Sequence, residues 1–458
     1  MPRGPRNLRI SCDGTGLTQF GGVALLHAFF RRLGIRRQLQ HAVRFRQRNN
    51  EYSISECIES LLYPLVLGLG RVETTEPLRR NGVFQYLAGL PHYPEATTLR
   101  RFLLRLAALG RDKLVTLHDR WRTEMLFRPR RRTSVILDLD TTVLTVYGRQ
   151  EKSAVGFNPK KRGRRSYQPL LCFEGESADV FAASYHPGDA QPGPVTGPLL
   201  EGVFRKLPGA IRQVRVRADA AFYNHEIAEI IERKGAFYVI VARLTHRLKN
   251  RLGGLRYRRI SSGVSAAEFR YCPDGWKHPA RFVVIQRPVP EEPSAQLTLF
   301  QMGGHTYQAF VTNLTLSPLN LWRFYNQRAT AELIIRELKD AYALGKIPTH
   351  DFAANEVFFQ TVLLAYNLLN WFKRLCAPPR WQRATLQRLR QRLLVVPAQL
   401  VHPAGAPTLR IAPGYVYAED FLDILKRVKT LAPLSEAEAA SNTRRTASKA
   451  NKRTLRNK

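Results

Sequence analysis

The spacing of apolar residues changes near residue 133, and this change limits the folds that the chain can adopt. Upstream, apolar side chains recur at helical intervals through residues 23–33 and 54–69. Downstream, Ser134–Asp140 alternates with the two-residue period of a strand. Further strand-like stretches lie at 143–147, 170–173, 180–185, 214–218 and 236–242, with a helix expected at 225–234. The sequence therefore predicts a helical N-terminal region followed by a mixed α/β sheet with flanking helices.

The second half of the chain adds a strand-rich stretch and two long helices. Short strands and turns fill residues 244–305, and we expect a β-rich insertion there. One long helix is expected at 320–344 and another at 351–376, where asparagines interrupt an apolar sequence and predict a buried helix rather than a transmembrane one. The Pro- and Gly-rich residues 187–198 are expected to form a loop. A basic helix, a hairpin and a last helix near 419–431 follow.

The charge of the chain narrows the classes of partner. Lys and Arg number 72 against 36 Asp and Glu, a net charge of +36, while 44% hydrophobic residues suffice for a sizeable core. A strongly basic protein that folds around a hydrophobic core attracts phosphates, so we expect a polyanionic partner. The longest apolar run, 61–70, is half the ~20 residues that a spanning helix needs. Five scattered cysteines without a C-x-x-C pair, and no apolar stretch after Met1, predict a cytoplasmic protein with reduced thiols.

The expected helix at 320–344 carries an unusual set of polar residues. Tyr325, Arg328, Glu332 and Lys339 are spaced by three, four and seven residues. At about 100° per residue these side chains fall within roughly 60° of one another, opposite an apolar face. A carboxylate flanked by cations suits a site where a metal ion meets phosphate oxygens. Spacing alone favours an ordinary amphipathic helix with solvated charges.

Three upstream aspartates shift that balance. Asp138 and Asp140 are two apart in a strand, so both point to the same side of the sheet. Asp219 follows the strand-like stretch 214–218 directly. A carboxylate in or beside a buried strand is costly unless it is paired or bound to metal. Structural alternatives remain for two of them: Asp219 as the cap of the next helix, and Asp138 as the partner of a nearby arginine.

Together these residues resemble the DDE insertion-sequence transposases of the IS-four superfamily. Tyr325-x2-Arg328-x3-Glu332-x6-Lys339 matches their Y-R-E-K signature without a gap. Residues 137–144, 147–151 and 156–160 look like the first-aspartate region, 217–222 like the second, and 311–313 lead into the third. The resemblance runs from about residue 21 to about residue 394.

The resemblance implies an RNase H-like core that a β-rich insertion interrupts before the glutamate helix. It also implies a catalytic, metal-binding triad of Asp140, Asp219 and Glu332, with Tyr325, Arg328 and Lys339 contacting phosphates of the transposon end. Asp138 is the alternative first ligand. Asp140 is preferred because two threonines follow it, as in the family pattern. Carboxylates without His or Cys partners select Mg²⁺ or Mn²⁺, and two such ions can drive an in-line displacement.

The implied function is metal-dependent cleavage at terminal inverted repeats and strand transfer into target DNA, by a homodimer that associates with the nucleoid. The alternatives are a related metal-dependent nuclease and a non-catalytic, or domesticated, DNA-binding protein. The expected domains are 1–132 (helical DNA-binding region and basic linker), 133–243 (core, first part), 244–306 (β-rich insertion), 307–378 (core, second part, with the glutamate helix), 379–434 (helix, hairpin and helix) and 435–458 (basic disordered tail).

Overall fold

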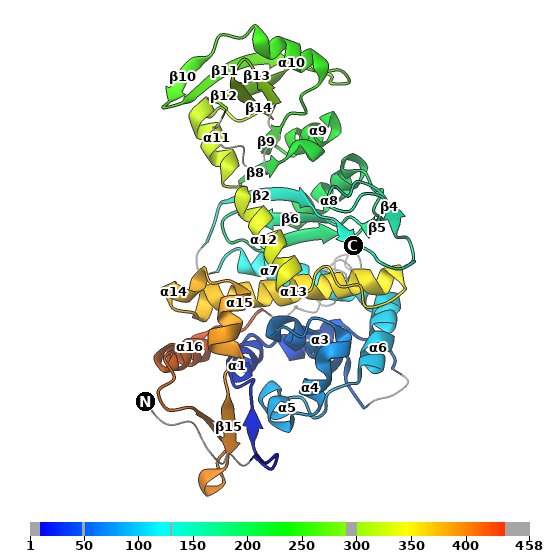
Figure 1. Ribbon diagram of the computed structural model, residues 1–458, viewed down its shortest axis with the longest axis vertical. Coiled ribbons are helices and arrows are strands. Elements are labelled where there is room, and N and C mark those ends of the chain that lie inside the picture. Colours follow the sequence, from blue (N-terminus) through cyan, green and yellow to red (C-terminus); the bar gives the residue numbers. More distant parts are fainter. Residues whose placement is uncertain (1–9, 48–50, 129–130, 290–299, 436–458) are drawn as a thin grey trace, which may run out of the picture.

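The computed structural model describes residues 10–47, 51–128, 131–289 and 300–435. One half of the molecule is a helical body, and the other half is a large mixed sheet with helices packed on it (Figure 1). Helix α13 (Phe352–Cys376) runs between the two halves. The mixed α/β architecture predicted from the sequence is therefore confirmed, and the expected tail lies almost wholly outside the described residues.

The N-terminal helices pack around α13 in one continuous apolar core. Local signals set their ends: a capping box between Ser53 and Glu56 begins α3, and Gly34, with a φ of 73°, ends α1 in the left-handed conformation that glycine tolerates. These elements are α1 (Val23–Leu33), α2 (Ile35–Ala42), α3 (Ile54–Leu67), η1 (Val72–Thr75), α4 (Glu76–Arg79), α5 (Gly82–Ala88), α6 (Ala96–Leu109) and α7 (Arg111–Met125).

The C-terminal region belongs to the same helical body. The expected hairpin is present as β15 (Ala398–Val401) and β16 (Thr408–Ile411), and β1 (Leu17–Thr18) adds a third antiparallel strand. The remaining elements are α14 (Pro379–Gln382), α15 (Leu386–Leu389), a π-helical turn η3 (Arg390–Leu394), η4 (Pro403–Gly405) and α16 (Ala418–Thr430). The basic helix expected here is therefore only a short helix that continues into the π turn.

The large sheet has ten strands in the order β10-β11-β12-β14-β9-β8-β2-β6-β7, with β13 paired to β14. Strand β2 is parallel to β8, and β8 to β9; all other pairs are antiparallel. Its strands are β2 (Ser134–Thr141), β6 (Leu170–Glu174), β7 (Val180–Ser184), β8 (Gln213–Ala218), β9 (Phe237–Val241), β10 (Arg258–Ser261), β11 (Val264–Tyr271), β12 (Ala280–Pro288), β13 (Phe300–Met302) and β14 (His305–Thr312). A separate three-stranded sheet contains β3 (Leu144–Thr145), β4 (Ala154–Val155) and β5 (Arg165–Tyr167).

Helices cover both faces of the large sheet. On one face, every second residue of β2 is apolar, including Leu137 and Leu139. These residues pack in one core with helices α8 (Pro192–Lys206), α9 (His225–Arg233) and α10 (His246–Gly253). On the opposite face lie α11 (Pro318–Asn326) and α12 (Ala329–Asp340), next to the polar residues of β2. Since side chains of a strand alternate between faces, the polar face of β2 points toward α12.

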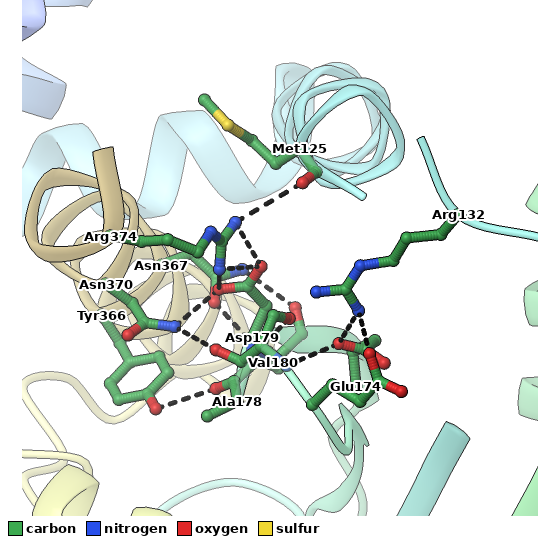
Figure 2. Close-up of polar contacts among 12 residues, drawn as sticks. Met125, Arg132, Glu174, Ala178, Asp179, Val180, Tyr366, Asn367, Asn370 and Arg374 are labelled. Carbon is green, nitrogen blue, oxygen red and sulfur yellow. Dashed lines mark hydrogen bonds and ion pairs between the residues drawn. The ribbon is translucent and has the colours of Figure 1, made fainter. Parts of the chain in front are cut away.

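Polar contacts fasten α13 to the sheet edge at β7 (Figure 2). The Asn367 side chain accepts a hydrogen bond from the Val180 amide and donates one to the Val180 carbonyl, both at 2.9 Å. Asn370 and Arg374 both bind the Asp179 carboxylate. The asparagines that interrupt the apolar sequence thus satisfy an edge strand, and the prediction of a buried helix is confirmed.

Two expectations from the sequence were wrong. The Pro-rich stretch 187–198 is not all loop, because α8 begins at Pro192, and the first helical turn needs no amide hydrogen there. The expected helix 320–344 is two helices, because the chain breaks at Gln327 and Arg328. The strand-rich stretch contains strands β10, β11, β12 and β13, which extend the main sheet, and also helix α10.

Candidate active site

Two of the candidate carboxylates meet at the ends of parallel strands. Asp140 is the penultimate residue of β2, and Asp219 directly follows β8. Leu139 is paired with Ala218 across these strands, so the two aspartates leave the sheet side by side. The Asp219 side chain accepts a hydrogen bond from the Ala221 amide at 2.9 Å, so it also caps the short helix η2 (Ala220–Phe222).

The break between α11 and α12 places a buried guanidinium between three carboxylates. Arg328 is only 3% exposed and donates to the Leu139 carbonyl at 2.9 Å. Its nitrogens lie 3.1 Å from Asp140, 3.7 Å from Asp219 and 3.5 Å from Glu332. The three carboxylates predicted as a triad therefore converge, although they are far apart in the chain, and they converge on an arginine of the same chain.

Access to solvent increases across this cluster. The Asp140 side chain is nearly buried, that of Asp219 is 39% exposed, and that of Glu332 is 66% exposed. Glu332 lies in the first turn of α12, where a carboxylate is favoured by the helix dipole. The site is thus open on the side of α12 and closed on the side of the sheet.

Burial sets the electrostatics of the cluster. Burial raises the pKa of Asp140 to about 6; Arg328 opposes this rise, and the Asp219 and Glu332 carboxylates add to it. Burial lowers the pKa of Arg328, but the surrounding carboxylates, Asp140 foremost, outweigh it and raise that pKa above its usual value. A single guanidinium does not neutralise three carboxylates, so the cluster keeps an excess of negative charge and attracts a further cation.

Asp138, on the same face as Asp140, has a partner of its own. Arg217 donates to both Asp138 oxygens, at 2.6 and 2.7 Å, and both side chains are almost fully buried. Gly175 makes room for this pair, because a Cβ there would lie 2.6 Å from the guanidinium. Asp138 is therefore engaged in a structural ion pair, which was the alternative that the sequence left open.

Sequence reasoning gave Arg217 no role of its own. The guanidinium also donates to the Phe324 carbonyl at 2.7 Å and to the Gln327 side chain at 3.3 Å. Arg217 thus binds the end of α11 and fixes the break that positions Arg328. The signal was present: a cation in a buried parallel strand, in register with Asp138.

The other two residues of the expected stripe are less exposed than a solvated helix face. Tyr325 is buried against Phe310, with ring centroids 4.9 Å apart, and burial raises the pKa of Tyr325 to about 12. The Lys339 ammonium donates to the Val143 carbonyl at 3.0 Å. Burial lowers the pKa of Lys339, and nearby Lys160 lowers it further. Of the four residues, Glu332 is the exposed one.

The oxygen donors fit a hard divalent cation by their chemistry. Among the described residues, no three acidic, histidine or cysteine side chains already lie close enough to hold a metal ion. The three carboxylates are separated by the Arg328 side chain, to which each lies within 3.7 Å. To hold a divalent cation, the three carboxylates would have to move closer together or displace part of the Arg328 guanidinium.

Comparison with known proteins defines the class. The family model described as transposase DDE domain group 1 matches residues 2–433, so the chain belongs to this transposase family. No curated protein matches it. A cryo-EM structure of a piggyBac transposase synaptic complex with hairpin DNA is similar, with a TM-score of 0.40 and 11% identity over 82% of this chain and 86% of that one. No described helix is long and apolar enough to cross a membrane.

Proposed function

We propose that this chain is a cut-and-paste transposase that cleaves DNA at terminal inverted repeats and transfers the ends to target DNA. The observation that carries this proposal is the convergence of Asp140, Asp219 and Glu332 at the ends of two parallel strands and the start of α12. Three separated carboxylates around one point are what a metal-dependent phosphoryl transfer requires. We assign these three residues as the catalytic triad.

An RNase H-like core is part of the same proposal. It is supported by the order β7-β6-β2-β8-β9, in which an antiparallel β2-β6-β7 meander is followed by two strands parallel to β2. The first aspartate lies on the central strand and the second after its parallel neighbour. We assign the chain to the IS-four superfamily because α11 and α12 carry its Y-R-E-K spacing.

Asp140, Asp219 and Glu332 would hold Mg²⁺ or Mn²⁺. Two such ions, when bound, supply activation of the attacking oxygen and stabilisation of the leaving oxygen. The chain's own residues orient these ligands: the Thr141 amide donates to Asp140 at 2.8 Å, the Ala221 amide donates to Asp219, and Arg328 contacts all three carboxylates. Arg328 keeps the carboxylates close together despite their mutual repulsion.

The proposed DNA contacts surround this triad. Lys339 and, once the guanidinium shifts, Arg328 would bind phosphates, and the Tyr325 hydroxyl would add one contact. The net charge of +36 supports binding of both the element ends and the target, and it supports association with the nucleoid. We propose a homodimer in the synaptic complex, because two ends must be held together, and DNA binding by the N-terminal helices.

The competing account is a non-catalytic DNA-binding protein in which Arg328 and the three carboxylates form a purely structural network. A cleavage assay distinguishes the two accounts. Plasmid DNA that carries the sequences flanking the gene is incubated with purified protein and Mg²⁺. Cleavage at inverted repeats by the parent protein, and its loss in Asp219→Asn and Glu332→Gln, supports the proposal. Asp340→Asn is the matched control, since Asp340 is exposed on the same helix as Glu332. Absence of cleavage by the parent, or cleavage by the triad variants, refutes it.

A further inference from the structure

A pocket of about 820 Å³ lies between α12, α13, the turn that joins β6 to β7, and residues 382–387 of the segment α14–α15. Its volume is within the range of about 300–1,000 Å³ that is typical of small-molecule sites. Leu333 lines the pocket and directly follows Glu332 on α12, about 100° away around the helix. The pocket is therefore next to the proposed active site but separate from the carboxylate cluster.

Hydrogen bonds between the walls hold the pocket open. The Glu337 carboxylate on α12 accepts from the Leu386 amide at the start of α15, at 2.5 Å. The Tyr366 hydroxyl on α13 donates to the Ala178 carbonyl in the turn between β6 and β7, at 2.9 Å (Figure 2). Since these contacts are made within the chain, the pocket is formed before any ligand arrives.

A buried lysine without an ion pair lines this pocket. Lys373 is 7% exposed, and its ammonium donates to the Ala384 carbonyl at 3.1 Å, which leaves two of its three donors. Within the described ranges of the chain it forms no ion pair. Burial lowers the pKa of Lys373, and the Glu337 and Asp179 carboxylates oppose this change. A buried ammonium is costly without an anionic partner, so a bound anion would stabilise its charged form.

Two exposed arginines line other walls of the pocket. Arg336 belongs to α12, and Arg383 belongs to the loop between α14 and α15. Among the residues that the structure describes, neither guanidinium has a hydrogen-bond or ion-pair partner. Together with Lys373, they place an uncommitted cation on each of three walls.

The acidic residues of the pocket do not balance its cations. Five cationic side chains and three carboxylates line it. Glu176 is paired with Arg132 at 3.1 Å, and Glu337 already binds the Leu386 amide. The third carboxylate, Asp340, is exposed on α12. The lining therefore has an excess of positive charge, which favours an anionic ligand.

The pocket also offers apolar surface. Leu333 is 56% exposed, although most leucines are buried in a folded protein. Ile334, Ala341 and Tyr366 add further apolar lining. A bare inorganic anion would leave this surface uncovered, so the lining suits a ligand that has a charged end and a larger, less polar body.

We propose that this pocket binds a small molecule that carries a diphosphate group, with its phosphates on Lys373, Arg336 and Arg383 and its body against Leu333. A diphosphate carries about three negative charges near neutral pH, which matches the three cations that lack an ion pair. Guanidinium groups bind phosphate oxygens in a bidentate geometry, and each such hydrogen bond is strengthened by charge. This site does not depend on the proposed DNA chemistry, because none of these cations holds a carboxylate of the triad.

Isothermal titration calorimetry of the full chain in EDTA tests this with two probes, inorganic pyrophosphate and adenosine diphosphate. Each probe should bind at one site per chain. The double variant Arg336→Gln with Arg383→Gln should weaken the binding of both probes about tenfold or more, because two charge-assisted contacts are lost. Leu333→Ser should weaken adenosine diphosphate about threefold or more and leave pyrophosphate unchanged, since only the nucleotide has a body to pack on Leu333.

The double variant Arg101→Gln with Arg205→Gln is the matched control, because it removes the same charge from exposed arginines on α6 and α8. It should bind both probes as the parent does. Equal weakening in the two double variants would show only the general attraction of a basic chain for anions, and would overturn the inference. Absence of saturable binding to the parent at about 1 mM of either probe would also overturn it.

A duplex oligonucleotide separates a free diphosphate from the phosphates of DNA. Adenosine diphosphate should bind the parent with the same affinity when the duplex is already bound, since the pocket is separate from the triad. Displacement of the nucleotide by the duplex, with an equal loss of duplex affinity in the Arg336 and Arg383 double variant, would assign these cations to DNA and overturn the inference. Loss of cleavage activity, by contrast, would count against the proposed function and leave these binding results standing.

Discussion

Two carboxylates of β2, Asp138 and Asp140, lie two residues apart on the same face of the sheet but are held in different ways. Asp138 receives two hydrogen bonds from Arg217, which serves no other carboxylate among the described residues. Asp140 shares the guanidinium of Arg328 with Asp219 and Glu332. The first pair is balanced in charge and closed to solvent, whereas the second cluster has an excess of negative charge and is open at Glu332.

This difference separates a structural ion pair from a site prepared for a ligand. A buried pair whose charges and hydrogen bonds are satisfied contributes to the fold and has nothing left to offer a substrate. In the proposed site, three carboxylates around one cation would bind a further cation, because that binding would relieve their repulsion. The same strand thus contributes one aspartate to the architecture and, two residues later, one to the proposed chemistry.

The largest expected effect is on cleavage. Asp219→Asn and Glu332→Gln should each reduce Mg²⁺-dependent cleavage about 10³-fold or more, because several kcal/mol of transition-state stabilisation are lost. The double variant should be little worse than either single one, since the ligands act as a unit. Single-turnover cleavage rates check this, and multiplicative losses in the double variant would show that the carboxylates act separately.

Next in size is the effect on stability. Arg217→Met should lower the free energy of unfolding by about 3–5 kcal/mol, because it leaves Asp138 buried and unpaired. Arg328→Met should also lower the free energy of unfolding. Mg²⁺ should restore much of that loss in Arg328→Met, by binding the three carboxylates, but not in Arg217→Met. Urea unfolding with EDTA and with Mg²⁺ measures both. If Mg²⁺ raised the free energy of unfolding of both variants equally, the proposed difference between the Asp138 pair and the Asp140 cluster would be wrong.

The pKa of Asp140 predicts a smaller, pH-dependent effect. The folded protein binds a proton at Asp140 up to a pH of about 6, whereas the unfolded carboxyl releases it near 3.8. The stability contribution of Asp140 is therefore complete below pH ~4 and is lost as the pH rises through ~6, by about 2–3 kcal/mol. In EDTA, the stability of the parent relative to Asp140→Asn should fall over this window. A flat difference would contradict the raised pKa.

The smallest expected effect concerns salt. If Lys339 binds one phosphate of the element end, Lys339→Ala should make the slope of log affinity against log salt shallower by about 0.9. Lys429→Ala is the control, because Lys429 is an exposed lysine on α16, in the helical body. Equal slopes for the two variants and the parent would leave Lys339 with only its hydrogen bond to Val143.

Much of the sheet follows from the sequence because it depends on the period of the apolar residues, and the alternation in β2 placed Asp138 and Asp140 on one face. The convergence of Asp140, Asp219 and Glu332 was implied by the resemblance to DDE transposases, because no residue pattern showed that β8 lies parallel beside β2. The break between α11 and α12 did not follow, since it depends on Arg217 binding backbone and side chain at the end of α11. Helical spacing therefore suggested an exposed stripe, whereas Arg328 turns inward.

The most direct test of the distinction between the two aspartates is a measurement of Mn²⁺ binding. The electron paramagnetic resonance signal of the free ion gives the amount of Mn²⁺ that is not bound. The variants are Asp140→Asn and Asp138→Asn; the second removes the carboxylate charge of the structural pair and leaves Arg217 bound to the end of α11. We predict that Asp140→Asn weakens Mn²⁺ binding by about tenfold or more, while Asp138→Asn binds as the parent does. Weakened binding in Asp138→Asn with unchanged binding in Asp140→Asn would contradict the account.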